Sequence, residues 1–119
     1  MSYYPIFTVP VDRINVFTIS EGETIAGQTY RIVCNVLFPS EITSPVSVGW
    51  YNVNGPISSE EGITIGRTMT SSGNITISLE FNPLRATHGG QFSCRAIITS
   101  NAAPYTYTRS SEVDIIVEG

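Results

Sequence analysis

Two cysteines and one tryptophan constrain the fold of this chain more strongly than any other residues. Cys34 and Cys94 are the only cysteines, and the single tryptophan, Trp50, lies between them. Regularly spaced residues lead up to the second cysteine: Leu79, Phe81, Leu84, His88, Gly90 and Phe92. This spacing predicts that the cysteines and the tryptophan occupy inward-facing positions of separate strands.

The rest of the chain alternates between apolar and polar residues, and turn residues interrupt the alternation about every ten positions. No segment of useful length has a helical period. Strands are expected at residues 11–20, 30–36, 46–50, 63–70, 75–81, 90–98 and 113–117. Their inward rows include Tyr30, Ile32, Val36, Val46, Val48, Ile75, Ile77, Ala96, Ile98, Val113, Ile115 and Val117. The pattern predicts an all-β fold in one domain that spans residues 1–119.

The cysteine–tryptophan–cysteine spacing, together with the run that ends at Cys94, resembles the immunoglobulin superfamily from about residue 11 to residue 117. The resemblance implies a two-sheet Greek-key sandwich with one disulfide between Cys34 and Cys94. It also implies that Trp50 packs on this disulfide and that Leu79 and Phe92 belong to the core. The alternative is a pair of buried free thiols, as in immunoglobulin-like domains of intracellular muscle proteins.

The subtype is either the intermediate (I-set) or a variable-like type. Residues 63–70 form strand D or begin with a short strand C′, and the pattern leaves both readings open. Two positions depart from the family pattern. His88 stands where the family usually has an aspartate that pairs with an arginine, here Arg67. Phe92 replaces the tyrosine of the corner motif, so the hydrogen bond of the tyrosine hydroxyl is lost.

Composition narrows the range of partners. The formal net charge is −4 and there is no lysine, so no basic surface for nucleic acid is expected. No segment is long and apolar enough to predict a membrane span, and the start does not resemble a signal peptide. We expect a module excised from a longer ectodomain.

No combination of residues predicts catalysis, so the domain is expected not to be an enzyme. His88 is the only histidine, and the two aspartates, Asp12 and Asp114, lie at opposite ends of the chain. The pair Glu60 and Glu61 lacks the spaced ligands of a calcium loop and is expected to be a solvated turn. We therefore expect no metal site and no cofactor.

The sequence Asn74-Ile75-Thr76 is an N-glycosylation motif. It follows a glycine turn, so the Asn74 side chain is expected to be exposed. A chain rich in serine and threonine also produces such motifs by chance.

The expected strands at residues 46–50, 90–98 and 113–117 correspond to strands C, F and G of the family, and the outer face of their sheet is the expected site of protein contact. Counting in steps of two from Trp50 and Cys94 places one group of outward side chains there: Ser47, Gly49, Tyr51, Ser93, Arg95, Ile97, Glu112, Asp114 and Ile116. Tyr51, Arg95, Ile97 and Ile116 combine the aromatic, cationic and aliphatic character of binding hot spots. Tyr105 and Tyr107, in the segment between F and G, are further candidates.

These observations predict an extracellular recognition or adhesion module of a cell-surface protein. Its partner would be a protein, including the case of a second copy of the same chain. The alternative is a spacer domain without a ligand of its own, either extracellular or in a muscle-type array. A third function, catalysis, would require a cleft with convergent titratable groups.

Overall fold

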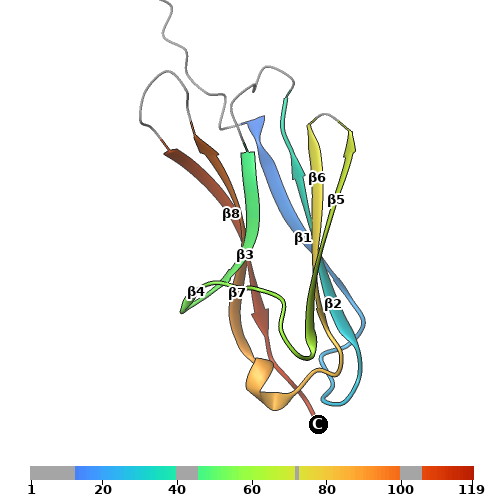
Figure 1. Cartoon of the computed structure of the whole chain (residues 1–119). Coiled ribbons are helices and arrows are strands. Elements are labelled where there is room, and N and C mark those ends of the chain that lie inside the picture. The colour runs from blue at the N-terminus through green and yellow to red at the C-terminus, as the bar shows by residue number, and fades with distance from the viewer. Residues whose placement is uncertain (1–12, 40–45, 72, 100–105) are drawn as a thin grey trace, which may run out of the picture.

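The described part of the chain forms two four-stranded antiparallel sheets that pack face to face (Figure 1). The computed structural model describes residues 13–39, 46–71, 73–99 and 106–119. In chain order the strands are β1 (Asn15–Glu21), β2 (Tyr30–Leu37), β3 (Val46–Asn52), β4 (Gly55–Pro56), β5 (Ile63–Ser71), β6 (Asn74–Phe81), β7 (Gly90–Thr99) and β8 (Thr106–Ile115). A short 3-10 turn, η2 (Ala86–His88), connects β6 to β7. The predicted all-β sandwich is confirmed.

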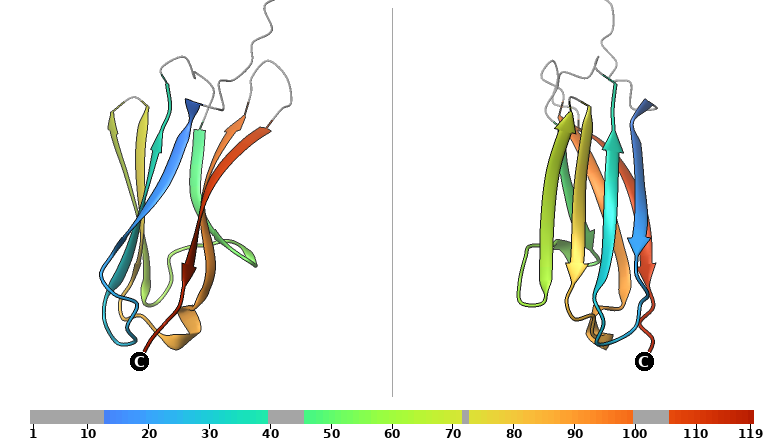
Figure 2. Two further views of the ribbon diagram at one scale, coloured as in Figure 1. Left: turned by 180° about the vertical axis from the view of Figure 1, so that it is seen from behind. Right: turned by 90° about the vertical axis from the view of Figure 1, so that its right-hand side faces the viewer.

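The two sheets divide the strands in the order expected of an immunoglobulin-like sandwich. One sheet has the order β1-β2-β6-β5, and the other has the order β4-β3-β7-β8. These orders correspond to strands A, B, E and D opposite C′, C, F and G. The chain crosses between the sheets three times, from β2 to β3, from β4 to β5 and from β6 to β7 (Figure 2).

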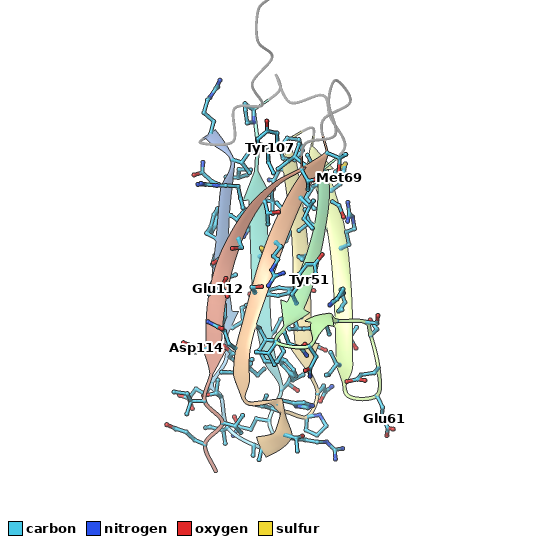
Figure 3. All side chains as sticks on the ribbon, turned by 90° about the vertical axis from the view of Figure 1, so that its left-hand side faces the viewer. Tyr51, Glu61, Met69, Tyr107, Glu112 and Asp114 are labelled. Atoms are coloured by element: carbon cyan, nitrogen blue, oxygen red, sulfur yellow. A yellow bond between two sulfur atoms is a disulfide. The ribbon has the colours of Figure 1, made fainter. Side chains whose placement is uncertain are left out.

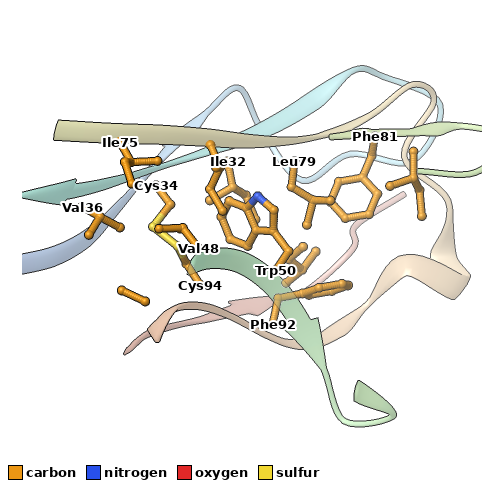
Figure 4. Packing of buried hydrophobic residues seen from close by; sticks show 14 of the residues in the cluster. Ile32, Cys34, Val36, Val48, Trp50, Ile75, Leu79, Phe81, Phe92 and Cys94 are labelled. Carbon is orange, nitrogen blue, oxygen red and sulfur yellow. A yellow bond between two sulfur atoms is a disulfide. The ribbon is translucent and has the colours of Figure 1, made fainter. Parts of the chain in front are cut away.

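The core lies between the sheets, where the inward rows of the strands meet (Figure 4). In β6 every second residue is buried, which is the period of a strand with one solvated face. Trp50 and Phe92 are 2% and 8% exposed, and Leu79 is fully buried. Strand β3 pairs Trp50 directly with Cys94, so the indole lies beside the disulfide.

A disulfide joins Cys34 of β2 to Cys94 of β7 and thereby links the two sheets. The two Cα atoms lie 6.4 Å apart. Both cysteines are fully buried. The expected disulfide is present, and the alternative of two free thiols does not hold.

The segment at residues 63–70, for which the sequence allowed either strand D or a short strand C′, belongs to the β1-β2-β6-β5 sheet. Residues Ile63–Ser71 pair along their length with β6, so this segment is strand D. A separate two-residue strand, β4, pairs with the end of β3 and takes the place of strand C′. Strand β1 begins at Asn15, and residues 11 and 12 of the expected first strand lie outside the described residues.

Candidate functional site

The outer face of the β4-β3-β7-β8 sheet carries the candidate contact residues in rows that run across the strands. Tyr51 of β3 lies opposite Ser93 of β7, and Ser93 lies opposite Glu112 of β8. In the next row Gly49 lies opposite Arg95. All five positions are on the solvent side, because the residues between them face the core. Figure 3 shows Tyr51 and Glu112 on neighbouring parts of this face.

A stack of two side chains lies at the centre of this face. The guanidinium carbon of Arg95 is 4.5 Å from the centre of the Tyr51 ring, which is cation–π geometry. The Tyr51 ring lies beside Gly49, where an added Cβ would be 3.6 Å from the ring carbon Cε1. A Cβ at this distance would make an ordinary van der Waals contact with the ring, so the tyrosine lies along its own strand beside Gly49, with the arginine above it.

Ser93 holds the arginine in this position from below. The Arg95 Nε–H donates a hydrogen bond of 3.0 Å to the Ser93 hydroxyl oxygen. Ser93 is only 2% exposed although its position is on the outer face. Two independent contacts, one with an aromatic ring and one with a hydroxyl, thus restrict the rotamers of Arg95.

A shallow hollow adjoins the stack. Its lining comes from β3, the turn after it, β7 and β8: Tyr51, Asn52, Val53, Gln91, Phe92, Ser93, Arg95 and Glu112. Val53 is 83% exposed at the rim. The turn that presents it is held by the Asn54 N–H, which donates to Asn52 Oδ1 at 2.8 Å. Acidic side chains, Glu112 and Asp114, follow along β8 on the same face (Figure 3).

Other predicted contact residues lie in different places. Ile97 is partly exposed on the outer face, and Ile116 is 75% exposed just after the end of β8. Tyr107 does not belong to the outer face. It pairs with the buried Ile98 and packs against the core, so Tyr107 is partly buried rather than exposed, and its role as a contact residue stays a prediction. Tyr105 lies outside the described residues.

Asn74 is half-buried rather than fully exposed, which corrects the expectation from the glycine turn. It is the first residue of β6, and it pairs with Leu37 of β2. Its Oδ1 is buried without a hydrogen-bond partner. The asparagine is part of the sheet, because the turn ends at Gly73.

His88 lies in η2, below the core. Its Nδ1 accepts a 3.0 Å hydrogen bond from the Arg85 N–H, and its ring centre is 4.8 Å from that of Phe81. Burial of the imidazole lowers the pKa of His88, and the nearby Arg85 charge lowers it further, while Glu60 opposes the change. The ring thus has a structural role in the corner. Arg67, the expected partner at this corner, is instead an exposed residue of β5.

The described ranges contain neither a cluster of metal ligands nor a membrane-spanning helix. No group of three or more His, Cys, Asp or Glu residues is arranged to hold a metal ion there. Nor does this part of the chain contain a helix with the length and hydropathy needed to cross a membrane. The disulfide indicates folding in an oxidising environment.

No model of a known protein family matches this chain, and no curated protein matches it either.

Sequence reasoning placed Tyr51 and Arg95 on one face but did not find the residues that hold them. Gly49 and Ser93 were expected only as outward positions, and no prediction was made for Val53. The sequence does place Gly49 two residues before Tyr51 on one strand, which indicates that the two residues lie next to each other on the same face. The register between β3 and β7 is also needed, because it places Arg95 opposite Gly49.

Proposed function

We propose that this chain is an extracellular protein-recognition domain of the immunoglobulin superfamily. Its contact surface is the outer face of the β4-β3-β7-β8 sheet, centred on Tyr51 and Arg95. The observation that carries the proposal is the stack of Arg95 on the Tyr51 ring, held by Ser93. Tyrosine and arginine are the residue types that most often dominate protein interfaces.

The stack supports recognition because its contacts with the Tyr51 ring and the Ser93 hydroxyl hold Arg95 before any partner binds. Ordering a flexible side chain at an interface costs about 0.5–1.5 kcal/mol, and a side chain that is already held avoids most of that cost. The exposed Val53 adds apolar area at the rim of the hollow. Glu112 and Asp114 add charges of the opposite sign to Arg95, so the face presents both signs to a partner.

A second copy of the chain is the partner to test first. A face with a cation and acids on neighbouring strands can be complementary to itself in a two-fold dimer. The disulfide and the sandwich architecture support a secreted or cell-surface location for such a module.

The test is sedimentation velocity of the oxidised protein over a wide range of concentration. Self-association is expected, and the triple replacement Tyr51→Ser, Arg95→Ser, Ile97→Ser should abolish it without unfolding the domain. A matched control replaces three exposed apolar residues of the other sheet, Phe17→Ser, Ile19→Ser, Leu37→Ser, and should leave association unchanged. Equal loss in both variants would contradict the proposed face.

A strict monomer would exclude self-recognition. The labelled domain would then be tested for binding to cell surfaces, with the same two variants as probe and control. Binding that depends on the Tyr51 and Arg95 face would support a receptor-like function. Binding that neither variant changes would move the site to the loops, and no binding at all would leave the spacer function.

A further inference from the structure

The outer face of the other sheet, β1-β2-β6-β5, carries an apolar stripe. Phe17 and Ile19 of β1 are 41% and 52% exposed, and Leu37 of β2 is 37% exposed. Phe17 lies opposite Asn35, and Ile19 lies opposite Val33, which is partly buried on the same face. The stripe therefore runs along the paired outer surfaces of β1 and β2.

The glycosylation motif lies directly beside this stripe. Asn74 is opposite Leu37 across β2 and β6, and cross-strand neighbours of this kind have Cβ atoms about 4.5–5.5 Å apart. Phe17 lies on β1, on the other side of β2 from β6. Two strand spacings, about 10 Å, therefore separate β1 from β6, the strand of Asn74. Of the two polar atoms of the Asn74 amide, Oδ1 is the one that is buried without a partner.

Apart from Leu37, the described outward residues near Asn74 on this face are polar and uncharged. Thr76 Oγ1 donates to Asn35 Oδ1 at 3.0 Å, and Ser78 and Thr68 continue the face. Within the described strands of this sheet, the outward charged side chains lie in one row at the far end: Glu21, Arg31 and Glu80. There the Arg31 guanidinium and the Glu21 carboxylate form a 3.4 Å ion pair.

From this arrangement we infer that Asn74 carries an N-linked glycan, whose first sugars cover the apolar stripe of Phe17, Ile19 and Leu37. In the transfer step, Asn74 Nδ2 forms a bond to C1 of the sugar and loses one proton. The sugar–phosphate bond of a polyisoprenoid-pyrophosphate-linked oligosaccharide breaks, and the lipid pyrophosphate leaves. The inference rests on the extracellular location proposed above.

The chemistry of the face favours a sugar over a protein partner. Sugar rings present C–H groups to apolar side chains and hydroxyls to neutral polar groups, and both kinds of partner surround Asn74. The opposite face of the molecule has the charges and the ordered arginine that a protein interface uses. A glycan on the β1-β2-β6-β5 sheet would also block protein partners from that face and leave the β4-β3-β7-β8 face open for binding.

Occupancy is tested first, on the full chain secreted from eukaryotic cells behind an added leader. We expect an added mass that peptide-N-glycosidase removes, with conversion of Asn74 to aspartate. Thr76→Ser keeps the motif and should keep the glycan, whereas Asn74→Gln should lose it. A secreted, disulfide-bonded chain without the added mass would overturn the inference.

Coverage of the stripe is tested by hydroxyl-radical footprinting of the glycosylated and enzymatically deglycosylated protein. Removal of the glycan should increase labelling of Phe17, Ile19 and Leu37 severalfold. Val53 and Ile116, which are exposed and lie away from this face, are internal controls and should not change. An occupied Asn74 with unchanged labelling of the stripe would overturn the covering role.

The two proposals can fail separately. Loss of self-association in the Tyr51, Arg95 and Ile97 variant does not depend on the glycan, because bacterially produced, oxidised protein can be used. Protection of the stripe in the absence of any glycan would show that a second copy of the chain covers it. That outcome would overturn the glycan as the occupant of this face.

Discussion

At the scale of single residues, Trp50 has the largest buried side chain of the described core, and its indole N–H has no hydrogen-bond partner. The indole is 2% exposed, and its Nε1–H is buried without a hydrogen-bond partner. A buried donor without a partner costs about 1–3 kcal/mol. The packing of the ring between the sheets, beside the disulfide, outweighs this cost (Figure 4).

Trp50→Ala should lower the free energy of unfolding by about 3–5 kcal/mol, because it leaves a large cavity in the core. Trp50→Phe should cost clearly less, because an aromatic ring remains and the unpaired N–H is removed. Urea denaturation of both variants checks the difference. Trp50→Phe keeps most of the ring volume in the core. If it were as destabilising as Trp50→Ala, filling of the core by an aromatic ring would not be the source of the stability.

His88 should make stability depend on pH. Its folded pKa is lowered, mainly by burial, whereas an unfolded histidine titrates near its ordinary value of about 6.5. Between these values the unfolded chain binds more protons, so the free energy of unfolding falls as the pH falls. This contribution is fully present above about pH 6.5 and is lost as the pH falls through the folded pKa.

The matched variant is His88→Asn, whose side-chain oxygen can accept the hydrogen bond from the Arg85 N–H but does not titrate. Denaturation over a series of pH values should show a steeper loss below about pH 6.5 in the native chain than in the variant. Since both proteins have the same carboxylates, the difference reports His88. Identical pH dependence in the two proteins would contradict this assignment.

At the scale of elements, the β5–β6 hairpin is held to the end of β2 by a close backbone approach. The Phe38 N–H donates a 2.9 Å hydrogen bond to the Gly73 carbonyl. Gly73 has φ of 91°, in the region that favours glycine. An added Cβ would also come within 2.5 Å of the Phe38 carbonyl oxygen.

Gly73→Ala should therefore destabilise the domain more than Gly27→Ala. Gly27 has nearly the same φ, 90°, but a Cβ there would meet nothing within 4 Å. The backbone conformation alone costs an alanine about 1–2 kcal/mol, and only Gly73 adds a steric clash with backbone. Thermal unfolding of the two variants measures the difference. Equal losses would show that the hairpin can move away from β2.

At the scale of the whole molecule, the disulfide is the covalent link between the two sheets. It joins residues 60 positions apart, so it removes much of the conformational freedom of the unfolded chain. Replacing Cys34 and Cys94 together with alanine should lower the free energy of unfolding by about 2–5 kcal/mol. Reduced native protein is the control with the original side chains. A loss below about 1 kcal/mol would contradict a stabilising role.

Much of this architecture could be predicted from the order of residues. The period of two along β2, β3, β6 and β7 follows directly from the apolar pattern, because each of these strands has one face in the core. The family resemblance carried by Cys34, Trp50 and Cys94 implied the two-sheet sandwich and its disulfide. The sequence could not assign β5 to one of the two sheets. β5 is an edge strand, and its sheet is defined by its backbone hydrogen bonds to β6, which leave no mark in the residue pattern.

The alternation of apolar and polar residues is enough to assign the side of each strand that faces the core, and hence to place Tyr51, Arg95 and Ile97 outside. Alternation is a local property, so it can be read without knowing the neighbours of a strand. Three features become visible only in the folded chain: Arg95 lies on the Tyr51 ring, Ser93 is buried beneath Arg95, and Leu37 lies opposite Asn74. These contacts depend on the register between strands that are far apart in the chain, and the packing of the whole core sets that register.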